Sequence, residues 1–146
     1  MRPLTTSRLS ITLGLAMDSL NAALRKAEAL NASVSITIVD IGGRMIHMAH
    51  MDNAPLQSRE IALNKARTAV GFGVSTSQWT ERLQRCSPAV QQGLPLQPGM
   101  ALFGGGEPFI LDGQVIGAVG VSGASEAMDT QCAQAAIEHA QTLLQG

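Results

Sequence analysis

The amino-acid sequence predicts an α/β protein of the α+β type, with a five-stranded, mostly antiparallel sheet flanked by helices. Two dipeptides support this prediction, Gly42-Gly43 and Asp112-Gly113, because each has the composition of a tight hairpin turn between two strand-like stretches. Segments with apolar residues three and four apart precede, separate and follow these hairpins. The resulting order, α-β-β-α-α-β-β-β-α, joins neighbouring strands by turns, which favours antiparallel pairing.

The first third of the chain predicts one helix and one hairpin. From Thr12 to Leu30 the apolar residues recur with helical spacing, and Thr12 is a favourable residue to cap the helix. The stretch SVSITIVD at 33–40 alternates small polar and β-branched residues, as a strand does. The stretch 44–51 then follows the two glycines as the returning strand.

The middle of the chain predicts a turn, two helices and a loop. Asp, Asn and Pro make 52–58 a turn, and apolar spacing then predicts a helix from 61 to 72. Ser75 or Thr76 is suited to begin a short helix. Residues 86–100 are rich in proline and glycine, and we expect them to form a long surface loop.

The last third predicts three strands and a helix. Residues 100–103 are expected to form one short strand, and 107–111 and 114–122 are expected to form the second hairpin. Ser125 is suited to cap the final helix, whose apolar residues fall on one face. We expect residues 1–10 to be a flexible N-terminal arm and 11–146 to form a single domain.

Composition indicates an oligomer. Hydrophobic residues make up 45% of the chain and charged residues only 14%, whereas charged residues usually supply about a quarter of a soluble chain. A surface with so little charge favours self-association, so we expect a homo-oligomer. The alternative is a compact, alanine-rich monomer.

Several partner classes are disfavoured by the same composition. The net charge is −1 and aromatic residues make up 3%, so we expect no nucleic-acid partner. No apolar run reaches 18 residues, and the N-terminus lacks the apolar core of a secretion signal, so we expect no membrane association. The two cysteines are far apart, and we interpret them as reduced thiols of a cytoplasmic protein.

Two histidines lie in the predicted strand 44–51. Because side chains alternate between the faces of a strand, His47 and His50 point in opposite directions and cannot bind one ion together. A single imidazole is sufficient as an axial ligand of haem iron. His50 is our candidate for that metal ligand because it lies next to the turn that begins with Asp52. The alternative is that one histidine packs under a helix while the other is solvated.

Lys65 and Thr68 interrupt the apolar pattern of the second long helix. They are three residues apart and therefore share a face. An ammonium and a hydroxyl in this setting could contact an acid, a phosphate or a propionate. The alternative is a lysine whose stem packs on the core while its ammonium lies in water.

Three consecutive glycines, Gly104, Gly105 and Gly106, precede the second hairpin. A backbone without side chains can approach a ligand closely and offer N–H groups to an anion. The alternative is a turn or bulge that requires positive φ. The later glycines of GAVGVSGAS do not match the dinucleotide fingerprint, and their strand belongs to a hairpin, so we predict no dinucleotide site.

Several motifs together resemble one known family. From about residue 11 to residue 144 the sequence is similar to the GlcG/HbpS-like haem-degrading domain family, which also supplies the C-terminal domain of some PduO-type corrinoid adenosyltransferases. The motifs that carry the resemblance are VD-x-GG, MD-x-A-P, K-A-x-T-A, GG-x-P and DG-x-V-x-GA-x-GVSGA. Together these motifs are specific, whereas each one alone is weak.

The resemblance implies a profilin-like, five-stranded antiparallel sheet with helices at its sides, and assembly from dimers up to octamers. It also implies binding of haem or a related tetrapyrrole in some members. The adenosyltransferase activity belongs to a separate helical domain and is not implied. On the matching motifs and their neighbours, the candidate cofactor-binding residues are His50, Asp52, Lys65, Thr68, Gly104, Gly105 and Gly106.

Our leading hypothesis is therefore a cytoplasmic homo-oligomer, accessory to a metabolic operon, that binds haem or a corrinoid-like tetrapyrrole near the end of strand 44–51. In this hypothesis Lys65 pairs with a propionate and His50 ligates iron. A second hypothesis is a scaffold or accessory subunit without a cofactor. A third is an enzyme acting on a hydroxy acid or aldehyde, with Lys65, Asp52 and Thr68 in its site.

Overall fold

Four strands form one antiparallel sheet in the computed structural model, which describes residues 1–146. The spatial order of the strands is β2-β1-β4-β3. Their bounds are Ser35–Asp40 for β1, Met45–His50 for β2, Gly106–Leu111 for β3 and Gln114–Ser122 for β4. The two hairpins therefore lie side by side, joined through the central pair β1 and β4.

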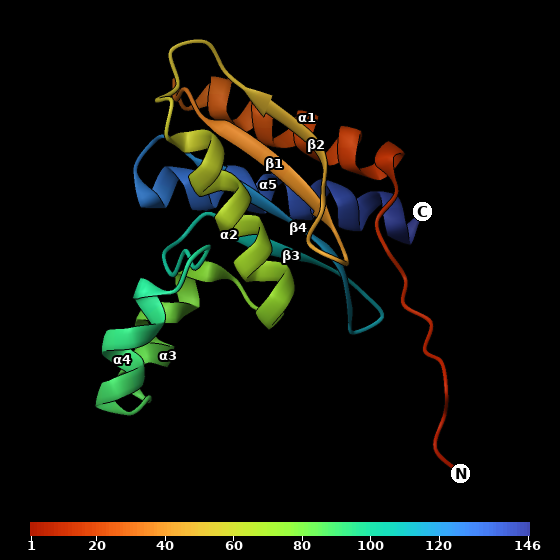
Figure 1. The fold of residues 1–146 in the computed structure, drawn as a ribbon. Coiled ribbons are helices and arrows are strands. Elements are labelled where there is room, and N and C mark those ends of the chain that lie inside the picture. Colours follow the sequence, from red (N-terminus) through yellow and green to blue (C-terminus); the bar gives the residue numbers. More distant parts are fainter.

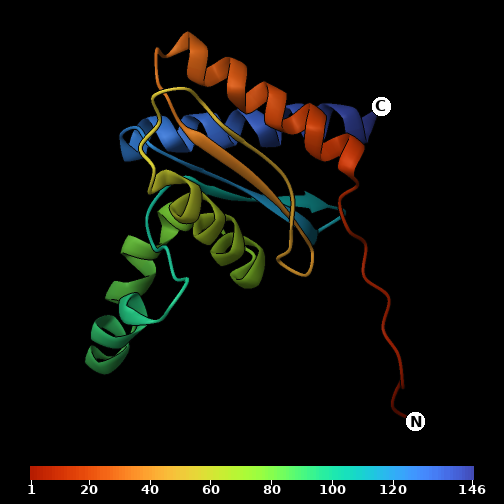
Figure 2. The same cartoon turned by 45° about the horizontal axis from the view of Figure 1, so that its top comes forward.

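Helices cover both faces of this sheet (Figure 1). The five α-helices are α1 (Leu13–Ala29), α2 (Ser58–Phe72), α3 (Trp79–Gln84), α4 (Pro88–Gly93) and α5 (Glu126–Gln145). Helices α1 and α5 pack together on one face, and α2 packs alone on the other (Figure 2). This arrangement confirms the predicted α+β class. No helix combines the length and the apolar character needed to cross a bilayer.

The predicted five-stranded sheet is wrong, because residues 100–103 form no strand. The main-chain N–H groups at both ends of this segment bond to side chains instead of a neighbouring strand. The Ala101 N–H donates to the Thr68 hydroxyl over 3.1 Å, and the Gly104 N–H donates to the Glu126 carboxylate over 2.6 Å. With these donors used, the sheet begins its last hairpin only at Gly106.

Both hairpin turns lie where the glycines predict them. Gly43 has a φ of 79°, and Asp112 and Gly113 have φ values of 51° and 78°. Two successive residues with positive φ match a type I′ turn, whose twist suits a hairpin. In the first turn the Asp40 carboxylate accepts hydrogen bonds from the Gly42 and Arg44 N–H groups, over 2.9 and 3.0 Å.

Small residues bring α2 very close to the sheet. Ala62, Ala66 and Ala69 are fully buried on α2 and face the strands. A Cβ placed on Gly120 of β4 would collide with the Ala62 carbonyl, so the backbones of helix and strand are in direct contact. This close packing fixes the position of α2 on the sheet, and with it the position of Lys65, which reaches the end of β4.

The segment between α2 and β3 forms a helical excursion away from the sheet (Figures 1 and 2). We define this excursion as residues 76–96, which comprise α3, α4 and two short 3₁₀ helices, Thr76–Gln78 and Leu94–Leu96. The predicted unbroken loop over 86–100 is therefore wrong in part. Ser87 explains the helix, because its hydroxyl accepts from the Val90 N–H and a proline follows at the first helical position.

Candidate functional site

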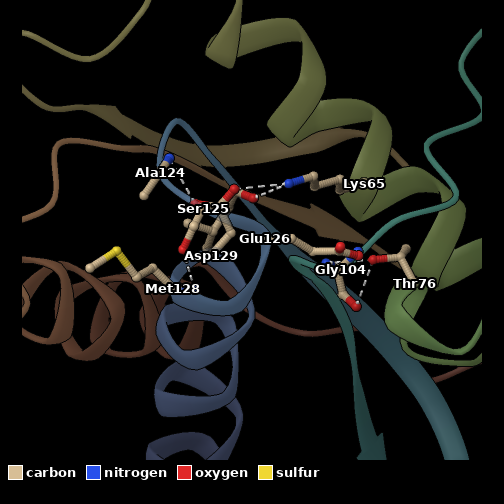
Figure 3. Close-up of polar contacts among 10 residues, drawn as sticks. Lys65, Thr76, Gly104, Ala124, Ser125, Glu126, Met128 and Asp129 are labelled. Carbon is tan, nitrogen blue, oxygen red and sulfur yellow. Dashed lines mark hydrogen bonds and ion pairs between the residues drawn. The ribbon is translucent and has the colours of Figure 1, made fainter.

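Lys65 is a buried ion-pair partner in the structure. Its side chain is 1% exposed, and Nζ donates to the Asp129 carboxylate over 3.2 Å and to the Val121 carbonyl over 2.8 Å. The Phe103 ring covers the ammonium, with 4.9 Å between Nζ and the ring centroid. Figure 3 shows Lys65 reaching from α2 to the first turns of α5. The ammonium thus joins three segments at the end of the sheet.

Burial and the attraction between Lys65 and Asp129 have opposite effects on the pKa values of the two side chains. Desolvation lowers the pKa of Lys65, and the nearby Asp129 and Glu126 carboxylates oppose that shift. Desolvation likewise raises the pKa of Asp129, while Lys65 and the N–H groups of Gly123 and Ala124 oppose it. The Lys65 ammonium already has two acceptors within the protein and is buried. An acid from a ligand outside therefore cannot reach it in this geometry.

The three glycines wrap around this ion pair. Gly104 donates to Glu126 of α5, and Gly105 has a φ of 125°. A Cβ on Gly105 would lie 2.7 Å from Lys65 Nζ, so a side chain there would displace the ammonium. Gly106 bonds through both main-chain groups to the Thr76 hydroxyl, over 2.8 and 3.4 Å. Gly105 and Gly106 therefore fit closely against the protein's own lysine, and Gly104 fits against α5.

Thr68 also has its hydrogen-bonding groups occupied within the protein. Its hydroxyl lies 2.7 Å from the Asn64 carbonyl and 3.3 Å from the Gly99 carbonyl, and it accepts from Ala101. The Thr68 side chain thus links α2 to the segment that precedes β3. Neither Lys65 nor Thr68 presents a free group to solvent, and no catalytic role follows from their geometry.

His50 lies at the opposite edge of the sheet, where β2 ends. Its Nε2 lies 3.1 Å from the Ala54 carbonyl, and its Nδ1 is buried with no partner. Because a carbonyl only accepts, the proton belongs on Nε2 and the lone pair on Nδ1. In this geometry neither ring nitrogen is available to an iron atom unless the turn at 51–54 moves.

A hollow of about 340 Å³ lies beside His50. Its lining residues are Leu24, Ala49, His50, Met51 and Asp52. The structure therefore brings His50 and Asp52 together, as the sequence predicts, but Lys65 does not line this hollow. The predicted site residues form two groups, an open one with His50 and Asp52 and a closed one with Lys65, Thr68 and the glycines.

Of the two histidines of β2, His47 is the one whose imidazole has no partner in the protein. It is opposite Ile38 in the β1–β2 ladder and so faces the α1 side of the sheet, as do Ala49 and Met51 in the hollow. The residue is half-buried, and its imidazole forms no hydrogen bond within the protein. The sequence favours His50 over His47 only because His50 lies closer to the turn. It does not show which of the two rings is hydrogen-bonded.

A second hollow, of about 370 Å³, lies between the start of α1 and the end of α5. Apolar residues dominate its lining, and Asp18 is its one charged residue; the full lining is Leu9, Ser10, Ile11, Thr12, Leu15, Asp18, Leu111, Ile116, Leu143 and Leu144. It contains no histidine, cysteine or methionine. It therefore has apolar walls but no soft ligand for a metal.

Two buried acids escaped the sequence analysis. Asp129 pairs with Lys65, and Glu107 is 7% exposed, accepting from the Ser75 hydroxyl over 2.7 Å while its second oxygen has no partner. Desolvation raises the pKa of Glu107. An acidic residue inside an otherwise apolar stripe was the available signal. Nowhere do three histidine, cysteine or acidic side chains group as a metal site.

Comparison with known proteins places these features in a family. The model of the family "Haem degrading protein HbpS-like" matches residues 11–138. An uncharacterised 15.0 kDa protein from the dhaT-dhaS intergenic region of Citrobacter freundii is 39% identical over 129 residues, which are 88% of this chain and 91% of that protein. These matches confirm the resemblance inferred from the motifs.

Solved structures agree with the sequence match. The crystal structure of Klebsiella pneumoniae protein ORFY is 34% identical, covers 97% of both chains and superposes with a TM-score of 0.89. The crystal structure of the PduOC:haem complex is 31% identical, covers 90% of this chain and 95% of that one, and has a TM-score of 0.81. The sequence motifs and the fold thus agree with the same family. The chain belongs to the family of HbpS-like haem degrading proteins.

Proposed function

We propose that this protein is a cytoplasmic, homo-oligomeric accessory protein that binds haem or a closely related tetrapyrrole. The observation that carries the proposal is the likeness to the PduOC:haem complex, in which a chain 31% identical and with a TM-score of 0.81 is solved with haem. The family model supports the same ligand class. The two cysteines are free thiols, as a reducing compartment favours.

The hollow beside His50 fits part of a tetrapyrrole. Leu24, Ala49 and Met51 supply apolar walls, and ligand pockets are usually apolar with a few polar groups. Its volume of about 340 Å³ is at the small end for ligand pockets. Leu24, Ala49 and Met51 would therefore hold part of the macrocycle by apolar contact.

Two imidazoles are candidates to contact the iron. His47 does not line the hollow itself, but its ring has no protein partner and it shares a face with Ala49 and Met51, which do. His50 requires that the Ala54 carbonyl give up its contact with Nε2. Haem would supply a redox-active iron to this surface. The chain's own part is to exclude water with its methionines and aliphatic side chains and to orient the iron by one imidazole.

Lys65 does not fit the role of propionate partner, because its ammonium is enclosed by Asp129, Val121 and Phe103. Arg25 on α1 is an exposed cation, and Lys26, half-buried, lies beside it. These two residues follow Leu24, which lines the hollow. Arg25 is therefore the candidate on this chain to pair with a propionate of a tetrapyrrole held there.

Titration of the purified, untagged protein with haem tests the proposal. We expect a shifted Soret band that saturates at a fixed ratio of haem to chain, and a corresponding gain in mass under native conditions. His47→Ala should remove most of the shift if His47 ligates iron, and His50→Ala if His50 does. His139→Ala is the matched control, because His139 is an exposed residue of α5 and does not line the hollow beside His50.

A colourless protein that does not change the haem spectrum at any ratio would contradict the proposal. In that case a stable oligomer without cofactor would support the scaffold hypothesis. Titration with cobalamin in parallel separates the two tetrapyrrole classes. Saturable binding of cobalamin but not of haem would restrict the ligand to corrinoids.

A further inference from the structure

Three buried polar atoms without a hydrogen-bond partner lie at neighbouring positions of the first hairpin. They are the hydroxyl oxygens of Ser35 and Thr37 on β1 and Nδ1 of His50 on β2, three of the six such side-chain atoms in the protein. Ser35 and Thr37 have no exposed surface. Buried polar groups nearly always have a partner, and an orphaned one indicates a bound water or ion. Three orphaned atoms in one place therefore indicate one bound group.

These side chains point to the same face of the sheet. Ser35 lies opposite His50 in the β1–β2 ladder, and Thr37 lies opposite both Met48 of β2 and Gly120 of β4. A Cβ on Gly120 would meet the backbone of α2, so this is the face that α2 covers. Because paired residues and alternate residues of a strand share a face, Met48 belongs to the same group. We call the four side chains the hairpin cluster; they are Ser35, Thr37, Met48 and His50.

The ladder places the four side chains of the hairpin cluster close together. The Met51 N–H donates to the Val34 carbonyl over 3.0 Å, so these two residues form a hydrogen-bonded pair. Bonded and non-bonded pairs alternate, and the pairs that contain His50 and Met48 are therefore both non-bonded. Opposite Cβ atoms are then about 4.5–5.5 Å apart, and alternate residues of one strand are about 6.6 Å apart. All four side chains can thus contact one small group held between them.

Every atom that the hairpin cluster offers to such a group is neutral. Nε2 of His50 lies 3.1 Å from the Ala54 carbonyl, which places the proton on Nε2 and the lone pair on Nδ1. Met48 offers a thioether sulfur, and the two hydroxyls offer oxygen lone pairs. The cluster contains no carboxylate and no thiolate. Thioether and imidazole suit copper, whereas hard divalent cations prefer carboxylate oxygens.

We infer that the hairpin cluster binds a soft monovalent metal ion, Cu(I), through Sδ of Met48 and Nδ1 of His50. The hydroxyls of Ser35 and Thr37 are its weaker oxygen neighbours. The competing occupant is an ordered water, because two hydroxyls and one imidazole nitrogen are enough to hold one. The sulfur distinguishes the two occupants, since a thioether is a weak acceptor for water but a good ligand for Cu(I).

A bare ion can enter from the outer edge of the sheet, where β2 has no neighbouring strand. Met48 and His50 are both half-buried, and the unbranched methionine side chain rotates readily. The ion carries no macrocycle, so the turn at 51–54 can keep its contact with Nε2 of His50. The inference therefore does not depend on haem binding and is tested on haem-free protein.

Native mass spectrometry of the untagged, haem-free protein tests the site, with Ag(I) in air and with Cu(I) without oxygen. We expect a single ion to stay bound to each chain in competition with bicinchoninate, and Zn(II) to be lost. Met48→Leu, which keeps the size of the side chain, and His50→Gln should each weaken Cu(I) binding by more than about tenfold. Met51→Leu is the matched control, because Met51 packs on the core at the opposite face of the sheet. Met17→Leu on α1 controls for exposed methionines.

X-ray absorption at the copper edge makes the test independent of how well the variants fold. We expect both sulfur and nitrogen neighbours around copper in the wild-type protein. Nitrogen and oxygen neighbours alone would overturn the inference, as would the loss of Cu(I) and Ag(I) to the competitor. Equal Cu(I) affinity in wild type, Met48→Leu and His50→Gln would also overturn it, and so would Zn(II) held as tightly as Cu(I). Equal weakening by Met51→Leu and Met48→Leu would overturn the assignment to the face that α2 covers.

Discussion

Lys65 of α2 and Asp129 of α5 form an ion pair of 3.2 Å that passes the end of the sheet and joins its two opposite layers. The side chains are 1% and 4% exposed. The ammonium also donates to the Val121 carbonyl of β4, which lies one residue past Gly120, the partner of the first residue of β3. One buried charge pair therefore completes the hydrogen bonding where the sheet stops.

Lys65→Met should strongly destabilise the fold. The substitution keeps the length of the side chain but leaves the Asp129 carboxylate buried without its cation. Removal of one partner of a buried pair typically costs about 3–5 kcal/mol. Urea denaturation followed by circular dichroism should show a loss of this size in the free energy of unfolding. The slope of that free energy against urea concentration should stay unchanged.

The control for this variant is Lys26→Met, which alters the chain's only other lysine, on the surface of α1. We expect it to change stability by less than about 0.5 kcal/mol. The double variant Lys65→Met/Asp129→Leu should regain much of the loss, because no charge is then left unpaired. A single variant as stable as wild type would contradict the buried pairing.

Glu107→Gln should alter the pH dependence of stability. Burial raises the pKa of Glu107 in the folded protein above its value in the unfolded chain. The stabilising contribution of the neutral acid is therefore present at acid pH and is lost as the pH rises through the raised pKa. Glutamine cannot titrate. The free energies of unfolding of wild type and Glu107→Gln should therefore agree at acid pH and diverge toward neutral pH, where the variant is more stable.

The expected divergence is about 1–3 kcal/mol, the usual cost of a buried polar group without a partner. Thermal or urea unfolding at a series of pH values would measure it. Ser75→Ala removes the one hydrogen-bond donor to Glu107 and should increase the divergence from the glutamine variant. Parallel curves for wild type and Glu107→Gln at all pH values would exclude a titrating Glu107.

Gly120→Ala should disrupt the packing of α2 on β4. The added Cβ would meet the Ala62 carbonyl and the Ala66 N–H, which are backbone atoms and cannot turn aside. Overpacking of this kind typically costs about 1–3 kcal/mol and sometimes more. Gly71→Ala is the matched control, because this glycine lies in α2 with no atom near its added Cβ. There alanine should stabilise the protein by about 0.5–1 kcal/mol, measured by the same unfolding assay.

The two cysteines should react at very different rates. Burial, followed by the negative charge of Asp129, raises the pKa of Cys132 to about 11, so its thiol stays protonated at pH 8. Cys86 is half-buried in the helical excursion. Alkylation followed by mass spectrometry should modify Cys86 in the native protein and Cys132 only after denaturant is added. Simultaneous modification of both would show that the α5 core opens more often than its packing indicates.

Local signals predicted the hairpins well. Gly42-Gly43 and Asp112-Gly113 each specify a backbone conformation that few other residues adopt, so the turns could be located without any knowledge of the fold. Thr12 and Ser125 likewise cap their helices through their own side chains. These features depend on residues no more than four positions apart, which is why sequence alone suffices.

Contacts between distant residues are the part of the structure that sequence patterns do not show. The predicted strand at 100–103 fails because Thr68 and Glu126, far away in the sequence, take its main-chain donors. Lys65 was expected to meet a ligand, but its partner Asp129 lies 64 positions further along the chain. A lone lysine in an apolar stripe signals an anion nearby, yet the pattern does not say whether that anion belongs to a ligand or to the protein.

The start of the helical excursion is anchored by the buried Thr76 and Trp79, but α4 has no buried residue and packs mainly on α3 and Leu94–Leu96. Segments held by so few contacts open in local unfolding events long before the whole domain does. Its amides should therefore exchange with deuterium much earlier than those of β1 and β4. The same exposure means that the chain around α4 can accept insertions or a fused tag while the rest of the protein folds as before.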